Sequence, residues 1–238
     1  MKARCRDLGR MAYADCWTLQ QRLFEELLSR KGARKEAART AEELTDNSED
    51  REIGTVLLVE HPPVYTLGKS GKAENLLVDP AQLAQWGATF FRIDRGGDIT
   101  FHGPGQLVCY PILDLEPLGL GLRAYIDALE ECVIRTAADY GIGAGRIAGA
   151  SGVWIDPQGR CPRKLCAIGV RSSRFVTMHG FALNATTDLA WFSRIHPCGF
   201  TDRGVTSIAR ETGAMPPMQE VKQRVIAHLG EVLGIELA

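Results

Sequence analysis

The sequence has no long hydrophobic run and no excess of charge of either sign. No apolar stretch approaches the roughly 20 residues that a membrane-spanning helix needs. The formal net charge is -1, with 28 basic and 29 acidic side chains, so nothing indicates a nucleic-acid footprint or attraction to an anionic membrane. The first residues carry two aspartates, Asp7 and Asp15, and lack the hydrophobic core of a signal peptide. We therefore expect a cytoplasmic protein that binds neither nucleic acid nor membrane.

The chain also lacks the cysteine pattern of a disulfide-stabilised or zinc-binding protein. Its seven cysteines are an odd number, which argues against a disulfide framework. Four residues separate Cys161 from Cys166, and only a proline separates His196 from Cys198. Neither spacing is typical of a common zinc module. We expect no bound metal, and a metal- or redox-binding module built on Cys161, Cys166 and Cys198 is kept as an alternative.

Hydrophobic periodicity predicts one α+β domain built on a mixed β-sheet packed by helices. The polar segment 30–52 has no aromatic residue, which is typical of a solvated insertion or a frayed helix without chemistry. Helices are expected at 11–29, 122–140 and 188–195 and from 217 onward. Strands are expected at 54–60, 89–94, 107–115, 151–156, 164–170, 174–178 and 180–185.

Cys198 is the first candidate for chemistry. Pro197 fixes its own backbone torsion, and Gly199 permits conformations that other residues avoid, so the thiol between them is suited to a turn. A free thiol with a pKa of about 8.5 is only a few per cent thiolate at neutral pH, and a nearby cation raises that fraction. On these residues alone, Cys198 can be a buried small side chain, a metal ligand or a nucleophile.

Lys164 is one of several candidate partners for that thiol, with His102, His179 and His196. It opens the apolar run 164–170, and strand alternation predicts that Lys164 shares a face with Cys166, Ile168 and Val170. A lysine at the end of such a strand either extends to solvent or becomes a partly desolvated amine that exchanges protons with a thiol.

The glycine-rich segment RGGDITFHGPGQ, residues 95–106, is the second candidate. It has neither the spacing of a P-loop nor a dinucleotide-binding GxGxxG pattern. Its glycines let the backbone pass close to a bound molecule, and the alternative is an elaborate hairpin turn. His102 alone is more typical of a hydrogen-bonded structural histidine than of an acid or base.

Taken together, these segments resemble the lipoate-protein octanoyltransferases. The resemblance covers roughly residues 54–210 and implies the fold of the catalytic domains of biotin and lipoate protein ligases, without a cofactor. It rests on RGG (95–97), TFHGPGQ (100–106) and Tyr110, together with EHPPVYTLGK (60–69), KLCAIGVR (164–171), HGFALN (179–184), PCGF (197–200) and VTSI (205–208) in the family's order.

The resemblance implies a reaction and its partners. An octanoyl group passes from octanoyl-acyl carrier protein to a lysine amine of lipoyl domains, in 2-oxoacid dehydrogenase complexes and the glycine-cleavage H protein. This is the first step of protein lipoylation in endogenous lipoate biosynthesis. The family's acyl-thioester cysteine corresponds to Cys198 and its pKa-lowering lysine to Lys164.

The resemblance also implies three substrate-binding segments. Among them, the small residues Gly169, Gly180 and Ala182 are expected to leave width for an extended acyl chain between strands. The segments comprise Arg95, Gly96, Gly97, Asp98, Ile99, Thr100, Phe101 and His102; Ala167, Ile168 and Gly169; and Gly180, Phe181 and Ala182.

Two features depart from the family pattern. The 30–52 segment is longer than the usual connection, and Cys166 stands where a small residue is commoner. Because Cys166 is expected on the face that carries Lys164, it competes with Cys198 as a thiol. Cys198 is preferred, since a thiol inside an apolar strand stays protonated. An ATP-dependent lipoate or biotin protein ligase is the nearest alternative function, and acyl transfer without a nucleotide would exclude it.

Overall fold

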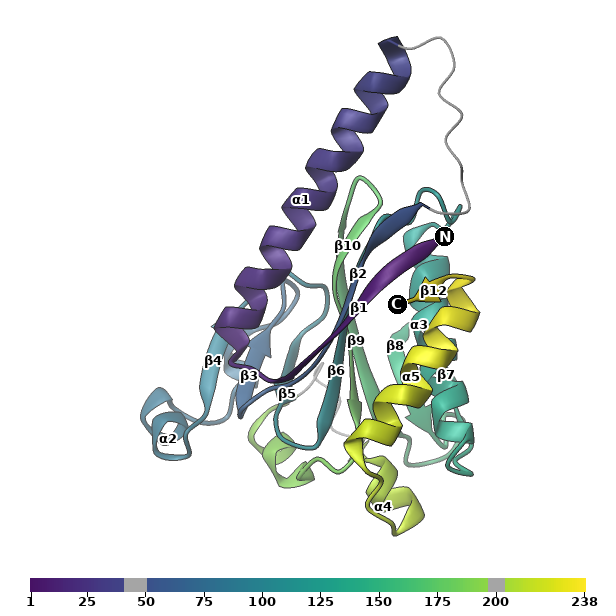
Figure 1. Cartoon of the computed structure of the whole chain (residues 1–238). Helices are drawn as coiled ribbons and strands as arrows, with labels where there is room; N and C mark the ends of the chain where they lie inside the picture. Colours follow the sequence, from purple (N-terminus) through teal and green to yellow (C-terminus); the bar gives the residue numbers. More distant parts are fainter. Residues whose placement is uncertain (41–50, 197–203) are drawn as a thin grey trace.

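The computed structural model describes residues 1–40, 51–196 and 204–238, and two β-sheets form its centre (Figure 1). The larger sheet has nine strands in the order β12-β1-β2-β6-β10-β9-β8-β7, with β11 paired to β9, and the smaller has the order β4-β3-β5. The elements are β1 (Lys2–Arg10), α1 (Tyr13–Thr40), β2 (Glu52–Glu60), β3 (Val64–Leu67), η2 (Ala73–Asn75), α2 (Pro80–Gln85), β4 (Thr89–Arg92), β5 (Ile99–His102), β6 (Gln106–Leu113), α3 (Leu122–Ala138), β7 (Ala144–Ile147), β8 (Ala150–Ile155), β9 (Arg163–Ser173), β10 (Val176–Asn184), η3 (Leu189–Arg194), β11 (Gly204–Val205), α4 (Ile208–Thr212), α5 (Met218–Leu233) and β12 (Glu236–Leu237).

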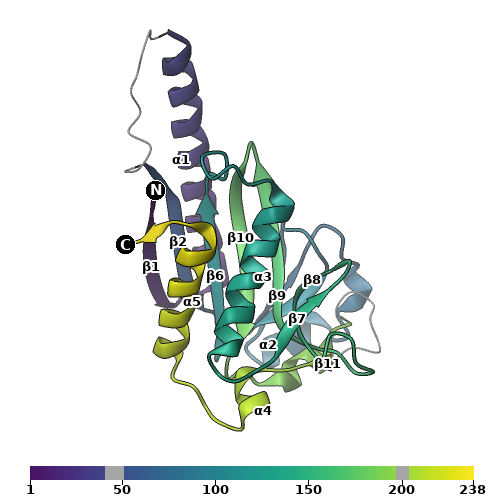
Figure 2. The same cartoon turned by 90° about the vertical axis from the view of Figure 1, so that its right-hand side faces the viewer.

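The larger sheet separates two hydrophobic cores, one under α3 and α5 and the other under α1 (Figure 2). Every side chain of β6 is buried, as expected for a strand that is covered on both faces. The sheet is mixed, because β2 pairs with β1 in parallel and with β6 antiparallel. The predicted architecture, a mixed sheet packed by helices, is confirmed.

Helix α1 is longer than the hydrophobic periodicity predicts. It continues through the first part of the 30–52 segment and ends at Thr40, whereas residues 41–50 lie outside the described residues. Residues 32–37 are exposed, as the prediction of a solvated segment requires. Lys31 departs from it: only 5% of its side chain is exposed, and its Nζ lies 2.5 Å from Asp114 Oδ1 and 2.8 Å from Glu116 Oε2. This buried ion pair ties α1 to the end of β6, 83 residues away in the chain.

The predicted strands 174–178 and 180–185 form one strand, β10. The residue between them, His179, has a φ of 63°. This left-handed conformation is uncommon for a residue with a side chain, and the pairing of β10 with β9 continues through it. Strand β1 (KARCRDLGR) is absent from the prediction, because its charged residues conceal the usual apolar alternation.

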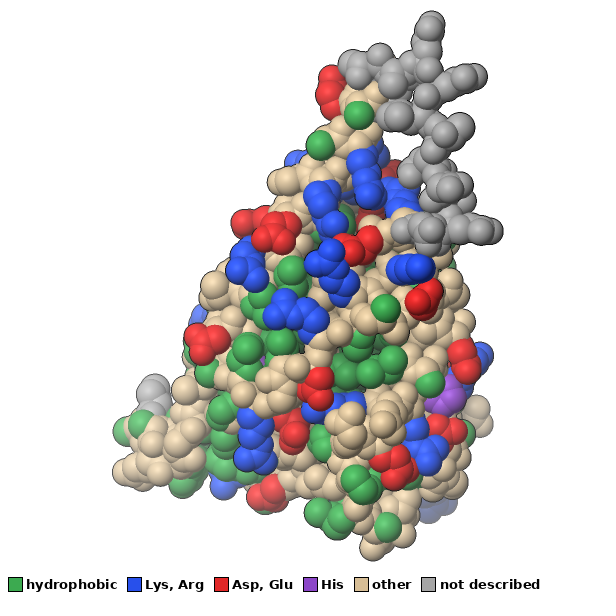
Figure 3. Space-filling model, in the orientation of Figure 1, with side chains coloured by type: hydrophobic (Ala, Val, Ile, Leu, Met, Phe, Trp, Pro, Cys, Tyr) green, Lys and Arg blue, Asp and Glu red, His purple; other side chains and the backbone are tan. Residues whose placement is uncertain are grey.

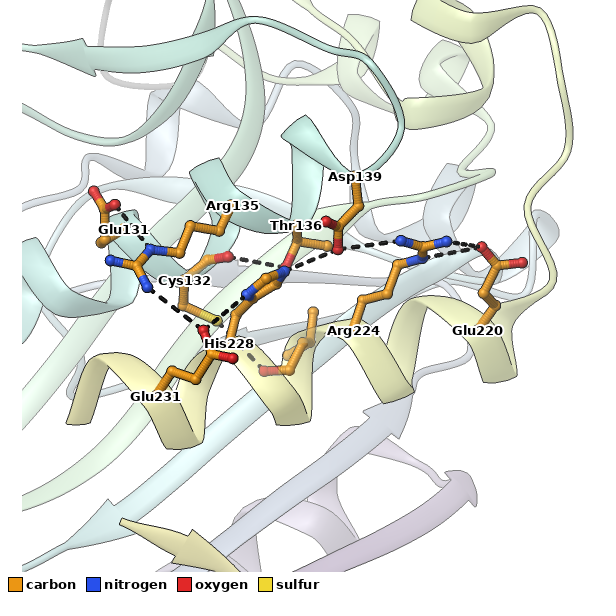
Figure 4. Close-up of polar contacts among 10 residues, drawn as sticks. Glu131, Cys132, Arg135, Thr136, Asp139, Glu220, Arg224, His228 and Glu231 are labelled. Atoms are coloured by element: carbon orange, nitrogen blue, oxygen red, sulfur yellow. Dashed lines mark hydrogen bonds and ion pairs between the residues drawn. The ribbon is translucent and has the colours of Figure 1, made fainter. Parts of the chain in front are cut away.

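A polar network joins α5 to the end of α3 (Figure 4). Asp139, at the C-cap of α3, accepts a hydrogen bond from His228 Nε2 at 2.8 Å and pairs with Arg224 Nη1 at 3.2 Å. Arg224 in turn donates to Glu220 at 2.8 Å. The hydrogen bond from His228 holds the pKa of the Asp139 carboxyl below its usual value. The network therefore fixes α5 along α3, on the side of the sheet opposite α1.

The surface carries charges of both signs. Over the face that α1 and β1 share, Lys and Arg side chains lie among Asp and Glu side chains (Figure 3), consistent with the near-zero net charge. Within the described part of the chain, no helix combines the length and the apolar character that crossing a membrane requires.

Candidate active site

A cavity of about 560 Å³ lies between the two sheets. Its walls come from β5 and the loop before it, the central strands β6, β9 and β10, the start of α3, and the turn before β8. Fourteen of the residues in the predicted site line this cavity: Arg95, Gly96, Gly97, Asp98, Ile99, Thr100, His102, Lys164, Ala167, Ile168, Gly169, Gly180, Phe181 and Ala182.

The cavity reaches both faces of β9. Strand β8 pairs with β9 only as far as Cys166, so the next residues of β9 present an edge. Ile168 and Val170 pack on the core under α3, whereas Gly169 faces the loop that carries Arg95. All three line the cavity, which therefore passes around this edge.

Arg95 fixes the glycine-rich loop above the sheet. Its side chain is 8% exposed, and Nη2 donates to Thr66 O at 2.8 Å and to Thr66 Oγ1 at 3.0 Å. The next residue, Gly96, donates its backbone N–H to Val170 O at 3.0 Å. The loop is thus held to β3 at one point and to β9 at another.

Gly169 and Gly180 do not leave width for a substrate, contrary to expectation. A Cβ on Gly180 would lie 2.2 Å from the backbone oxygen of Cys109, on the neighbouring strand β6. A Cβ on Gly169 would lie 2.9 Å from the oxygen of Gly96. Both spaces are already filled by backbone, so these glycines permit close packing of the cavity wall.

Gly180→Ala is therefore expected to destabilise the fold. Because the obstructing atom is backbone, we expect the free energy of unfolding to fall by about 3 kcal/mol, the upper end of overpacking costs. Urea denaturation measures the change. Gly32→Ala is the matched control, since a Cβ there meets nothing within 4 Å and alanine favours helix. Equal stabilities for the Gly180→Ala variant and the parent would contradict the prediction.

His102 belongs to a hydrogen-bonded chain in which each donor and acceptor is assigned by its neighbours. Thr66 Oγ1 accepts from Arg95, so its O–H donates to His102 Nε2 at 3.2 Å. His102 Nδ1 then donates to Gln106 Oε1 at 2.8 Å. Burial lowers the pKa of His102 to about 3, so the ring is neutral at physiological pH. This is the structural histidine that the residues alone favour.

The same series of hydrogen bonds continues to the backbone of Lys164. Gln106 Nε2 donates to Asn184 Oδ1 at 2.8 Å, and Asn184 Nδ2 donates to Thr206 O at 3.0 Å. Thr206 donates its backbone N–H to Lys164 O at 3.0 Å. Continuous hydrogen bonds thus connect the loop at Arg95 with the strand that carries Lys164.

A β-bulge places Lys164 and Cys166 on opposite faces of β9, which corrects the predicted alternation. The pairing with β8 shifts between Val153 and Trp154, and both Leu165 and Cys166 lie in the core under α3 and α5. The Lys164 ammonium instead lies 4.5 Å from the ring centroid of Trp154. An extra residue in one strand has this effect, because it reverses the alternation beyond it.

Cys166 is consequently a poor competitor for chemistry. Its side chain is fully buried, and this burial raises the pKa of its thiol well above the usual value. Cys161 is exposed. Within residues 1–40, 51–196 and 204–238, no cluster of His, Cys, Asp or Glu could hold a metal ion.

Cys198 belongs to residues 197–203, which lie outside the described residues, but His196 before this segment and Gly204 after it are described. On one side, the N–H of His196 donates to Asn75 O at 2.9 Å. On the other, β11 pairs in parallel with the start of β9, so that Val205 is the partner of Lys164. The chain that follows Cys198 therefore returns next to Lys164.

Phe101 is the one described residue of the predicted site that does not line the cavity. Its ring stacks on Trp191 at 5.1 Å between centroids, with an interplanar angle of 3°, in the core of the smaller sheet. Tyr13, Gln106, Trp154 and Asn184 line the cavity but are absent from the predicted site. The sequence could have indicated Gln106 and Asn184, because each is a polar amide at the end of a strongly apolar segment. No such pattern distinguishes Tyr13 or Trp154.

A second buried histidine lies in the cavity wall. His179 Nε2 contacts Asp94 Oδ1 at 2.9 Å, and Asp94 also pairs with Arg171. The hydrogen bond from His179 is the main cause of the lowered pKa of Asp94. Burial lowers the pKa of His179 itself. The contact between His179 and Asp94 anchors β10 to the segment that leads into the glycine-rich loop.

Comparison with known proteins identifies the family of the chain. The sequence matches the model of the lipoyl protein ligase A/B catalytic domain over residues 13–230. It is 52% identical to an octanoyltransferase of Bacteroides thetaiotaomicron over 98% of this chain and 96% of that protein, and 45% identical to one of Flavobacterium johnsoniae over 99% and 98%.

Solved structures agree on the fold. A putative lipoate protein ligase of Thermoplasma acidophilum superposes with a TM-score of 0.69 at 15% identity, over 100% of this chain and 88% of that one. A biotin protein ligase of Aquifex aeolicus gives a TM-score of 0.52 at 14% identity, over 97% and 70%. The chain belongs to the lipoyl protein ligase A/B catalytic domain family and, within it, to the octanoyltransferases.

Proposed function

We propose that this octanoyltransferase takes its octanoyl group from octanoyl-acyl carrier protein, holds it as a thioester on Cys198, and transfers it to a lysine amine of a lipoyl domain. The observation that carries the proposal is the position of Lys164 in the wall of the cavity, next to the strand that follows Cys198. The cavity volume, about 560 Å³, falls within the roughly 300–1,000 Å³ of small-molecule sites.

The first step forms the acyl-enzyme. The Cys198 thiolate attacks the carbonyl carbon of the carrier thioester, a new carbon–sulfur bond forms, and the bond to the carrier sulfur breaks. Lys164 accepts the proton of Cys198 and supplies one to the departing thiol. One thioester replaces another of similar energy, so this step needs no ATP.

The second step delivers the acyl group. The lysine amine of the acceptor attacks the Cys198 thioester, an amide bond forms, and the thiolate leaves. Lys164 accepts a proton from the attacking amine. Because an amide is more stable than a thioester, the transfer runs downhill and regenerates the enzyme. The proposed catalytic groups are therefore Cys198 and Lys164, and the residues that line the cavity bind the acyl chain.

The proposed acceptors are the lipoyl domains of 2-oxoacid dehydrogenase complexes and the glycine-cleavage H protein. One structurally similar protein, a bipartite lipoate protein ligase of Thermoplasma acidophilum, is described together with its E2 lipoyl domain. We place the reaction in the cytoplasm, where a free reactive thiol remains reduced, as the first step of protein lipoylation.

Intact-mass measurement tests this proposal. After the protein is mixed with octanoyl-acyl carrier protein and no nucleotide, we expect a mass gain of one octanoyl group that hydroxylamine removes. Addition of a lipoyl domain should move the octanoyl group to its lysine. Transfer that requires ATP, or transfer to the lipoyl domain without any covalent acyl-enzyme, would contradict the proposal.

A further inference from the structure

Trp154 contacts the proposed catalytic lysine through the face of its ring. The Lys164 Nζ lies 4.5 Å from the ring centroid, within the roughly 6 Å of a cation–π interaction. Trp154 is itself 2% exposed, and its Nε1 donates to Ala150 O at 3.1 Å. The indole is therefore held in one orientation before it meets the lysine.

Two features of the backbone direct Lys164 onto that ring. Val153 and Ile155 belong to the core under α3, so Trp154, between them, points to the other face. The bulge in β9 turns Lys164 to the same face. A Cβ on Gly152 would lie 3.6 Å from Lys164 Cε, so the lysine side chain runs along β8 to reach the ring.

Lys164 is partly buried, and a ring in this position opposes the effect of that burial on its amine. Removal of an amine from water favours its neutral form, whereas the negative face of an indole attracts the ammonium, most strongly where water is excluded. A charged and oriented ammonium is what an adjacent thiol needs in order to ionise.

We propose that Trp154 is a positioning residue for Lys164: its ring orients the ammonium in the cavity, favours its charged form, and so favours the Cys198 thiolate. This inference rests on the proposed function, because it assigns Trp154 a role in the reaction only through Lys164. Trp154 itself needs no contact with the reacting atoms.

The pH dependence of Cys198 reactivity reports on the thiol and Lys164, because few neighbouring groups change charge in the same pH range. Burial lowers the pKa of His102 to about 3 and also lowers the pKa of His179. Burial raises the pKa of Tyr13 and Tyr110. These four groups therefore keep one charge state between pH 7 and 9. Among the described residues, the ionisable and charged groups that share the cavity with Lys164 are Tyr13, Arg95, Asp98, His102, Tyr110 and His179. Cys166 on its own strand and Glu130 on α3 lie on the other face.

The experiment is alkylation of Cys198 by iodoacetamide across pH 7–9, quantified by peptide mass spectrometry, with the exposed Cys161 as internal reference thiol. For Trp154→Leu we expect the midpoint of the Cys198 profile to rise by about one pH unit, which slows alkylation at pH 7 about five- to tenfold. Trp154→Phe retains a weaker aromatic face, so the midpoint of its Cys198 profile should lie between those of Trp154→Leu and the parent.

The same variants should also transfer octanoyl groups with a lower kcat, because the reacting thiol is less ionised. Trp86→Leu is the matched control. It removes a ring that also lies 4.5 Å from a cation, the Arg194 guanidinium, and should leave the Cys198 profile unchanged. Thermal unfolding confirms that each variant is folded.

A wild-type pH profile for folded Trp154→Leu, or for Trp154→Phe if the leucine variant does not fold, would overturn the inference. Failure of the proposed function would give a different result, because the parent protein itself would then form no octanoyl thioester. A parent that forms the thioester, with Trp154 variants of unchanged profile, therefore refutes only the role of Trp154.

Discussion

Replacement of Cys198 by alanine is expected to abolish the octanoyl-enzyme adduct and to lower octanoyl transfer by at least about 10⁴-fold, as for loss of the nucleophile in other covalent enzymes. Without the thiol no thioester can form. Cys198→Ser should also fail, because a hydroxyl ionises far less readily than a thiol, and an ammonium near it cannot make up the difference. Radiolabelled octanoyl transfer and intact mass measure the two losses separately.

Cys166→Ala is the matched control for this prediction. Cys166 is completely buried in the core, and burial raises the pKa of its thiol. Its replacement should keep the adduct and the transfer rate, and should cost about 1 kcal/mol of stability for the small cavity it leaves. An adduct that survives in Cys198→Ala and disappears in Cys166→Ala would reverse the assignment.

Lys164→Met is expected to lower octanoyl transfer at pH 7 by about 10³-fold, through two losses. Without the ammonium, the pKa of Cys198 returns toward about 8.5, so the thiolate becomes a few per cent of the protein. Proton transfer to the departing thiol is lost as well, and such transfers typically contribute about 10²–10⁴-fold. The variant should recover part of its rate as the pH rises from 7 to 9, because alkaline solution restores the thiolate.

Lys164→Arg separates the two losses. The guanidinium retains the positive charge but does not give up a proton, so the alkylation midpoint of Cys198 should stay near that of the parent while turnover remains low. The pH profile of alkylation and the rate of octanoyl transfer are measured on the same samples. If Lys164→Met had the alkylation profile of the parent, Lys164 would not be the group that ionises the thiol.

The architecture could be predicted because its evidence is local. The apolar run of β2 and the helical periodicity of α5 each indicate the type of the element, and together they indicate a sheet packed by helices. The glycine-rich segment 95–106 likewise stands out in the sequence, and seven of the eight residues predicted there line the cavity.

Features that depend on distant contacts could not be predicted in this way. The bulge beside Leu165 follows from the pairing of β9 with β8, and alternation along β9 alone places Lys164 on the wrong face. The burial of Lys31 depends on Asp114, a partner that no local pattern reveals. Trp154 belongs to the site only because that bulge turns the lysine toward it.

The hydrogen-bonded chain from Thr66 to Thr206 admits one arrangement of its side-chain amides. If the Gln106 amide rotated by half a turn, its NH₂ group would face the N–H of His102, and its oxygen would face the oxygen of Asn184. Its oxygen would also face the oxygen of Phe101, so three repulsive contacts would replace three attractive ones. The donors and acceptors in this wall of the cavity therefore have only one possible order. A conservative exchange such as Gln106→Glu removes a donor from the middle of the series, and it should disturb both the loop that carries Arg95 and the strand that carries Lys164.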